Sequence, residues 1–250
     1  MLQHARKLYK VILKGNTLNK DRTNFDMPIP KIIHQTFKSS QLPRLTRWHI
    51  SRFRKNNPDY AYEFYDDARI DRFLLEEYDE ETFKLYKRLN IGAAKADFFR
   101  YAVLYKKGGI YVDIDSGING SLNNFIKPDD CAVITREGVP GFFAQWALIF
   151  DAGHPFLKRT IEIVLENIRT NAFPNDVHKM TGPTAYTLAI NQCIAEDPDI
   201  CYRIFGTDYN KHLKVKYKLG KFFLYEKGDH WKKKQLTTPV LKPDDMIKGI

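Results

Sequence analysis

Two aspartates follow an apolar run in the segment GGIYVDIDSG, residues 108–117. Asp113 and Asp115 are two residues apart, so on an extended strand their side chains would share one face. Carboxylate oxygens suit a hard divalent cation such as Mg²⁺ or Mn²⁺, and such an ion can neutralise a diphosphate. The spacing therefore predicts a metal site at the end of a strand. Taken alone, a D-x-D pair also fits a solvated turn.

A second charged pair lies in the segment just before these aspartates. Asp97 and Arg100 are three residues apart within AAKADFFRYAVLYKKGG (93–109), whose apolar residues recur at helical spacing. The two side chains therefore share a helix face. From spacing alone, a local ion pair on the helix surface explains them as well as a functional role does. Gly108 and Gly109 are expected to end the helix.

Strands and helices alternate along the chain, which predicts a single α/β layered domain. We expect helices at 42–56, 66–90, 93–109, 154–171 and 181–196. We expect strands at 30–37, 60–67, 110–115, 132–137 and 145–151, with further short strands in the tail from 200 to 227. The first strand then leads to a helix that ends before Asn57 and Pro58.

Charge and composition limit the function classes. The chain has 250 residues, 43% of them apolar, and a formal net charge of +10, which describes a globular protein with a preference for anionic partners. Basic residues cluster at 6–14, 44–55, 211–221 and 232–234. None of these clusters accompanies a DNA-reading motif, so we expect no nucleic-acid partner.

The N-terminal residues and the cysteines indicate the cellular location. Residues 1–14 form a basic amphipathic pattern that fits either an anionic membrane surface or a helix packed on the domain with a solvated basic face. Residues 15–27 read as a linker, which leaves 28–250 as the domain. Cys131, Cys193 and Cys201 are expected to be reduced thiols. No run of 18 apolar residues occurs. We therefore expect a cytoplasmic protein, peripheral at the inner membrane face if residues 1–14 lie on the membrane.

Three segments together resemble one known family. IPKIIHQTF (29–37), NPDYAYEFYDD (57–67) and ADFFRYAVLYKKGGIYVDID (96–115) are similar to the DXD-containing glycosyltransferases of family 32. That family includes yeast-type mannosyltransferases and bacterial capsular-polysaccharide enzymes, and it is distantly related to the large clostridial glucosylating toxins. The resemblance runs from residue 29 to about 195, and more weakly to 231. It implies the GT-A fold, a mixed, mostly parallel sheet flanked by helices, with Mn²⁺ or Mg²⁺ as cofactor.

The resemblance implies roles for the two charged pairs. Asp115 would ligate the metal directly, and Asp113 would contact the metal and the donor's ribose or sugar. Asp97 and Arg100 would bond the hydroxyls of the donor sugar, with Arg100 also near the phosphates. These four residues are the predicted catalytic set.

Further donor and acceptor contacts follow from the same resemblance. Gln35, Thr36 and Phe37 would lie at the base, although Phe37 also fits the core. Tyr111 would line the donor pocket or pack on the sheet. Gln145 lies on the acceptor side. The amide of Gly182 would face the cleft, although this residue also fits an ordinary helix start. His230 would be a further metal ligand and Trp231 would lie over the nucleotide, although both also fit a flexible basic tail.

The resulting hypothesis is a retaining, metal-dependent glycosyltransferase. It would move a sugar from a UDP- or GDP-sugar to the hydroxyl of a glycan or lipid-linked acceptor, in surface polysaccharide or glycan synthesis. No residue is an evident nucleophile by spacing, which fits a front-face mechanism. Two other classes remain open: a non-catalytic nucleotide-sugar-binding protein on the same fold, and a metal-dependent nuclease or phosphotransferase.

Overall fold

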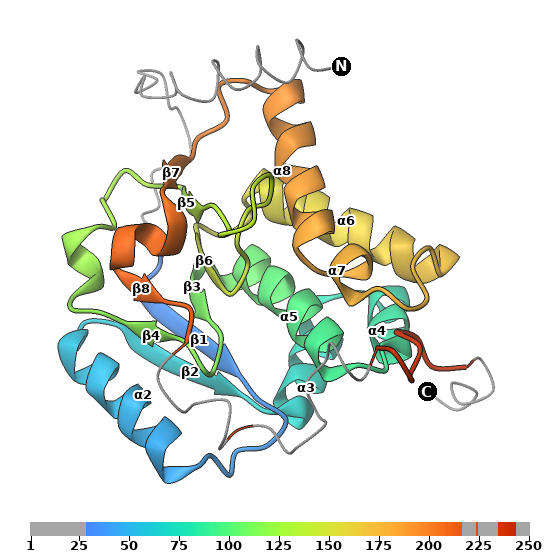
Figure 1. Cartoon of the computed structure of the whole chain (residues 1–250), viewed down its shortest axis with the longest axis horizontal. Coiled ribbons are helices and arrows are strands. Elements are labelled where there is room, and N and C mark those ends of the chain that lie inside the picture. The colour runs from blue at the N-terminus through green and yellow to red at the C-terminus, as the bar shows by residue number, and fades with distance from the viewer. Residues whose placement is uncertain (1–28, 217–223, 225–234, 244–250) are drawn as a thin grey trace.

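The computed structural model describes residues 29–216, 224 and 235–243 (Figure 1). The helix predicted at 1–14, the linker at 15–27, and the two predicted ligands His230 and Trp231 lie outside the described residues. So does most of the alternating segment 215–226.

A six-stranded sheet lies at the centre, in the order β2-β1-β3-β6-β5-β7. Strand β1 pairs in parallel with β2 and β3, and β5 pairs in parallel with β7, whereas β6 runs antiparallel to both β3 and β5. The predicted mixed, mostly parallel sheet is therefore confirmed. The strands are β1 Ile32–Thr36, β2 Ala61–Tyr65, β3 Gly109–Val112, β5 Ala132–Thr135, β6 Ala147–Phe150 and β7 Arg203–Phe205.

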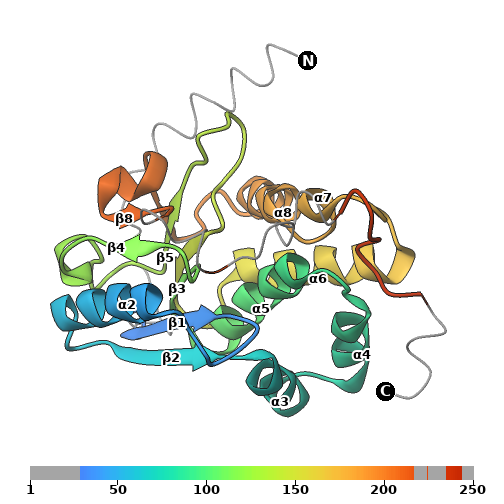
Figure 2. The ribbon, with the colours of Figure 1, turned by 60° about the horizontal axis from the view of Figure 1, so that its bottom comes forward.

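Helices cover both faces of this sheet (Figure 2). Helix α2 packs on one face, where Ile50 and Phe53 join the core with Val112 of β3. On the other face, Tyr111 of β3 joins the core built by the remaining long helices. Adjacent residues of β3 therefore point to opposite faces of the sheet and belong to different hydrophobic cores. The helices are α2 Arg44–Asn56, α3 Asp67–Glu77, α4 Glu80–Arg88, α5 Gly92–Lys107, α6 Pro155–Thr170, α7 Val177–Met180 and α8 Pro183–Glu196.

Among the described residues, no helix is both long and apolar enough to cross a bilayer. The longest, α5 and α6, have 16 residues each, below the roughly 20 apolar residues that a span requires.

Two glycines make the sharp connection from α5 to β3. Gly108 and Gly109 have φ angles of 62° and 100°, in the left-handed region that side chains rarely adopt. A Cβ atom on Gly109 would also lie 2.6 Å from the carbonyl oxygen of Ile32. The glycines therefore end the helix, as predicted, and bring β3 directly against β1.

The predicted strand 110–115 is too long. Strand β3 ends at Val112, and the chain then turns, with the Ser116 amide donating to the carbonyl of Asp113 at 2.9 Å. Asp113 and Asp115 consequently lie in a turn and do not share a strand face. After the turn, β4 Gly117–Ile118 pairs antiparallel with β8 Leu213–Lys214 in a separate small sheet.

The prediction of three free thiols is wrong. Cys131 and Cys201 form a disulfide, with their Cα atoms 6.0 Å apart, and only Cys193 is free. The reason is tertiary, because β5 and β7 pair in parallel with Val133 opposite Arg203. That register places the residues two positions earlier, Cys131 and Cys201, side by side.

Candidate functional site

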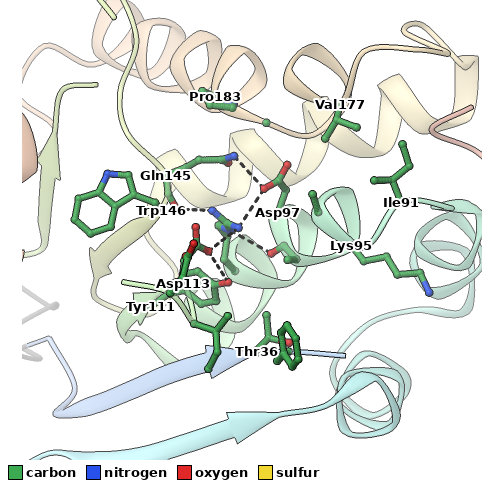
Figure 3. Close-up of a pocket in the computed structure, with 18 of the residues that line it drawn as sticks. Thr36, Ile91, Lys95, Asp97, Tyr111, Asp113, Gln145, Trp146, Val177 and Pro183 are labelled. Carbon is green, nitrogen blue, oxygen red and sulfur yellow. Dashed lines mark hydrogen bonds and ion pairs between the residues drawn. The ribbon is translucent and has the colours of Figure 1, made fainter. Parts of the chain in front are cut away.

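A cavity of about 780 Å³ opens where β1 and β3 end (Figure 3). Its walls come from the end of β1, helix α5, the turn after β3, the segment before β6, and the start of α8. A ligand site outside the carboxyl ends of the strands is typical of α/β sheets. Nine of the predicted site residues line it: Thr36, Phe37, Asp97, Arg100, Tyr111, Asp113, Asp115, Gln145 and Gly182.

The Arg100 guanidinium is the electrostatic centre of the cavity wall. It is buried and lies 3.2 Å from an Asp97 oxygen and 3.0 Å from an Asp113 oxygen. It also donates to the carbonyl of Gln145 at 2.7 Å and lies over the ring of Tyr111. The predicted Asp97–Arg100 pair therefore exists, but inside the protein, where a second carboxylate shares the arginine.

Both carboxylate oxygens of Asp97 already have partners. One accepts a hydrogen bond from the Gln145 amide at 2.9 Å and pairs with Arg100, and the other accepts from the Thr181 hydroxyl at 3.0 Å. Burial raises the pKa of Asp97 to about 6, against the opposing charge of Arg100. This environment orients Asp97 firmly toward Arg100.

A buried tyrosine extends this network behind the cavity. The Tyr101 hydroxyl bonds the side-chain oxygen of Gln145 and lies 3.1 Å from the carbonyl of Thr181. It therefore fixes the orientation of the Gln145 amide, whose NH₂ group faces Asp97. Neither Tyr101 nor the Thr181 side chain was predicted as a site residue. For Tyr101 the reason is that a lone aromatic within a helix is typical of a core position.

The two aspartates of the turn differ in their surroundings. Asp113 accepts from the Tyr111 hydroxyl at 3.1 Å through the same oxygen that faces Arg100. Asp115 is buried, and its described charged partner is Lys216, 3.9 Å away and half exposed. Burial, and then the charge of Asp113, raises the pKa of Asp115 to about 6. Asp115 is thus a buried carboxylate that its protein neighbours leave poorly neutralised.

These surroundings fit a divalent cation. Asp97, Asp113 and Asp115 bring three negative charges against the buried Arg100 and the more distant Lys216. One oxygen of Asp113 and both of Asp115 have no short described hydrogen bond from a side chain, which leaves them available to a hard cation. Within the described ranges, no cluster of three or more His, Cys, Asp or Glu residues forms a complete metal site. The predicted third ligand, His230, lies outside those ranges.

The structure places Gln35 behind the cavity and not in it. Its side chain is fully buried, and its NH₂ group donates to the carbonyl of Asp113 at 3.1 Å. Its oxygen accepts from the Tyr62 hydroxyl at 3.0 Å. Gln35 therefore holds the backbone at the start of the D-x-D turn, whereas the neighbouring Thr36 and Phe37 line the cavity itself.

The prediction that the Gly182 amide faces the cleft is wrong. That amide donates to the carbonyl of Val177 at 3.0 Å, inside the turn that joins α7 to α8. A Cβ atom at this position would lie 2.9 Å from the Cα atom of His178. Gly182 therefore permits close packing beside the cavity, and α8 begins at Pro183, two residues after the predicted start at 181.

Several cavity residues were not predicted from the sequence, because only tertiary contacts bring them to the cavity. Lys216 follows β8, which the sheet with β4 holds beside the D-x-D turn, and the Ser116 hydroxyl also bonds the carbonyl of Val215 at 2.7 Å. The basic cluster at 211–221 was the only signal in the sequence. The other unpredicted polar or aromatic members of the lining are Lys38, Asp67, Asn90, Lys95, Glu137, Trp146 and His178.

The raised pKa of Asp115 predicts a pH-dependent stability. In the metal-free chain, Asp115→Asn is expected to raise the free energy of unfolding at pH 7, and this gain should shrink toward pH 5. The pKa of Asp115 is about 6 in the folded state and near 3.8 in the unfolded chain. At pH 7 the ionised carboxylate therefore destabilises the folded state relative to the unfolded one. As the pH falls through 6, the folded wild type takes up the proton first and recovers stability.

Urea denaturation in EDTA at pH 5, 6 and 7 measures this difference. Asp79→Asn is the control, because the Thr82 amide lowers the pKa of Asp79, so both its folded and unfolded values lie below this range. A difference between Asp115→Asn and wild type that stays constant across the range would contradict the assignment.

Comparisons with known proteins support the family resemblance. Residues 43–133 match the family described as "Glycosyltransferase sugar-binding region containing DXD motif". The chain is 37% identical over 215 residues to mannosyl phosphorylinositol ceramide synthase CSH1 of Saccharomyces cerevisiae, covering 81% of this chain and 53% of that protein. It is 31% identical over 139 residues to inositol phosphoceramide mannosyltransferase 3 of Schizosaccharomyces pombe, covering 56% of this chain and 38% of that protein. The chain thus spans about half the length, or less, of these curated relatives.

Solved structures support the fold. The PaToxG glycosyltransferase superposes with a TM-score of 0.57 at 21% identity, covering 88% of this chain and 83% of that chain. The UDP-bound glycosyltransferase domain of the YGT toxin superposes with a TM-score of 0.51 at 10% identity, covering 84% and 82%. The predicted similarity in fold to GT-A glycosyltransferase domains is therefore confirmed.

Proposed function

We propose that the protein transfers a sugar from a nucleotide diphosphate sugar to an acceptor hydroxyl, on the premise that residues 43–133 match the sugar-binding region of the DXD-motif glycosyltransferases. The observation that supports this most is the placement of both aspartates at the cavity, where Asp113 pairs with the buried Arg100 and Asp115 is poorly neutralised. A donor with a diphosphate and a bound divalent cation supplies the complementary charges.

We propose a hexose donor. Of the two curated relatives named above, one is described as a mannosyltransferase and the other as a mannosyl phosphorylinositol ceramide synthase, which favours GDP-mannose. A neighbour by fold is described as UDP-bound, so UDP-sugars belong among the candidates. Thr36 and Phe37, at the end of β1, are our candidates for the contact with the base, although the Thr36 hydroxyl already donates to the carbonyl of Tyr65 at 2.8 Å.

The acceptor is proposed to enter beside the segment before β6. Glu137, Val139, Gln145 and Trp146 line the cavity there, and Val139 is 59% exposed. An exposed valine and an indole suit a partly apolar acceptor. Because two relatives are named for inositol phosphoceramide or mannosyl phosphorylinositol ceramide, we propose a lipid-linked or glycan acceptor.

The chain's own groups are assigned these roles. Asp113 and Asp115 would hold Mn²⁺ or Mg²⁺, which when bound stabilises the charge of the departing diphosphate. Arg100 orients Asp97 and Asp113 through its two ion pairs, and its positive charge would stabilise the phosphates of a bound donor. Lys216, half exposed beside Asp115, can add a second cation.

Retention by a front-face mechanism is our proposal for the stereochemistry. In it, the leaving phosphate accepts the proton of the acceptor hydroxyl as the new glycosidic bond forms on the same face. Support comes from Asp97, whose two oxygens already bind Arg100, Gln145 and Thr181 and so are not free to attack the sugar. Mass-spectrometric detection of a peptide glycosylated on an active-site carboxylate would overturn this mechanism.

A membrane-face location on the cytoplasmic side stays a prediction. Its sequence basis included three reduced thiols, and the disulfide between Cys131 and Cys201 removes that part of the basis. Such bonds persist mainly in oxidising compartments.

A thermal-shift panel tests the proposed function. GDP-mannose and a set of UDP-sugars are each added with and without Mn²⁺. One donor at about a hundred times its Kd should raise the Tm by roughly 5–10 °C, and only with metal. A plain nucleotide-binding protein would show the shift but release no nucleoside diphosphate. No shift with any donor would contradict the proposal.

A further inference from the structure

Helix α2 carries a concentrated positive charge that the proposed reaction does not use. Its thirteen residues include five cations and no acid. No aspartate or glutamate occurs between Asp26 and Asp59. Among the described residues, Arg44, Arg47 and Lys55 form no ion pair, so their charge is not neutralised by a described neighbour.

The helix has a clear inner and outer side. Thr46, Ile50 and Phe53 are buried against the sheet. Residues 44, 48, 51 and 55 are spaced by three or four positions and therefore form one line on the opposite side. All four are exposed. Figure 1 shows α2 at the outer edge of the molecule, beside β2 and β4.

A large apolar side chain, Trp48, lies between Arg44 and Lys55 on this exposed line. Trp48 is 53% exposed, although an indole of that size usually finds a buried place. The Arg52 guanidinium lies 5.6 Å from the centre of its ring. Burial, followed by the charges of Arg52 and Lys214, lowers the pKa of the adjacent His49.

We propose that the outer side of α2, made of Arg44, Arg47, Trp48, Arg52 and Lys55, docks the protein on an anionic lipid surface. Arginine and lysine attract acidic headgroups, and an indole prefers the level of the headgroups. One exposed tryptophan among cations that have no described acidic partner fits an anionic membrane surface. None of the residues of α2 lines the site cavity.

The docking surface of α2 is connected by a short segment to the edge of the cavity. The segment from Phe37 to Pro43 joins the cavity edge, at Phe37 and Lys38, to the start of α2 at Arg44. Docking through α2 would therefore hold the edge of the cavity near the lipid headgroups. The docking itself does not depend on the proposed sugar transfer, because its test measures binding and not activity.

The test compares the binding of the full chain to phosphatidylcholine vesicles with and without phosphatidylserine. Wild type is expected to bind only the anionic vesicles. Arg47→Gln/Lys55→Gln should weaken that binding by about 30-fold, since two cations near the surface are lost. The charge-matched control is Arg72→Gln/Lys158→Gln, two exposed cations on α3 and α6, which should bind as wild type does. Trp48→Phe should abolish most of the tryptophan quenching by brominated lipids.

Several results would overturn the inference. Wild-type affinity in Arg47→Gln/Lys55→Gln would do so, as would loss of binding on deletion of residues 1–14 with no effect of the α2 variants. Duplex DNA bound more tightly than anionic vesicles, and lost in the same variant, would assign the surface to nucleic acid. Circular dichroism and the melting temperature of each variant separate these results from misfolding.

Discussion

Asp115→Asn is expected to lower the rate of sugar transfer on the order of a thousandfold while the chain stays folded. Asparagine keeps the shape but removes the charge, and the stabilisation that a carboxylate-held divalent ion gives to a leaving diphosphate amounts to several kcal/mol. Asp115 is buried beside the cavity, with Lys216 at 3.9 Å as its described charged partner. The rate is measured as release of the nucleoside diphosphate at saturating Mn²⁺.

The same variant separates chemistry from folding. Since the ionised Asp115 is disfavoured in the metal-free fold, Asp115→Asn should be at least as stable as wild type at pH 7. Asp199→Asn, an exposed aspartate remote from the cavity lining, is the control for activity and should leave the rate unchanged. Full activity in Asp115→Asn would contradict the assignment of the metal site.

Arg100→Leu is expected to lower the free energy of unfolding by about 3–5 kcal/mol at pH 7. Leucine fills much of the same space but leaves Asp97 and Asp113 buried without the cation that lies 3.2 Å and 3.0 Å from them. For a chain of this size, that loss corresponds to a Tm lower by on the order of 10 °C. Chemical denaturation in EDTA measures it.

The loss should be smaller at pH 5 than at pH 7, because the two carboxylates take up protons once Arg100 is gone. Arg169→Leu is the matched control. Its partners Glu81 and Glu166 lie on the surface, so removing this arginine should change stability little. Equal effects of the two substitutions would show that the Arg100 network is not the buried electrostatic centre described above.

The elements were predictable where periodicity alone decides them. Helix α5 and the start of β3 follow from apolar spacing and two glycines. The end of β3 was not predictable, because Asp113 continues the alternation of an ordinary strand. What ends the strand is a turn supported by Gln35, whose amide reaches the Asp113 carbonyl from β1, 78 positions away in the sequence.

The candidate site was only partly predictable for the same reason. The resemblance gave the residues that line the cavity, such as Asp97 and Asp115, because they lie in contiguous motifs. Thr181 and Tyr101 support Asp97 and Gln145 through contacts between distant segments. Lys216 reaches Asp115 only because β8 pairs with β4. No local pattern contains such pairings.

The disulfide shows this limit most simply. Three unpatterned cysteines predict free thiols, and only the parallel register of β5 and β7 brings Cys131 opposite Cys201. The buried Cys193 fits the prediction because it lies on the inner face of α8. Topology, and not composition, decides which thiols meet.

Release of the nucleoside diphosphate tests most directly whether Asp113 and Asp115 support metal-dependent use of a nucleotide sugar. Wild type is incubated with GDP-mannose and with each UDP-sugar, in Mn²⁺ and in EDTA, beside Asp115→Asn. We predict that one donor is consumed in Mn²⁺, that EDTA stops the release, and that Asp115→Asn abolishes it. Release that persists unchanged in EDTA or in Asp115→Asn would contradict the account.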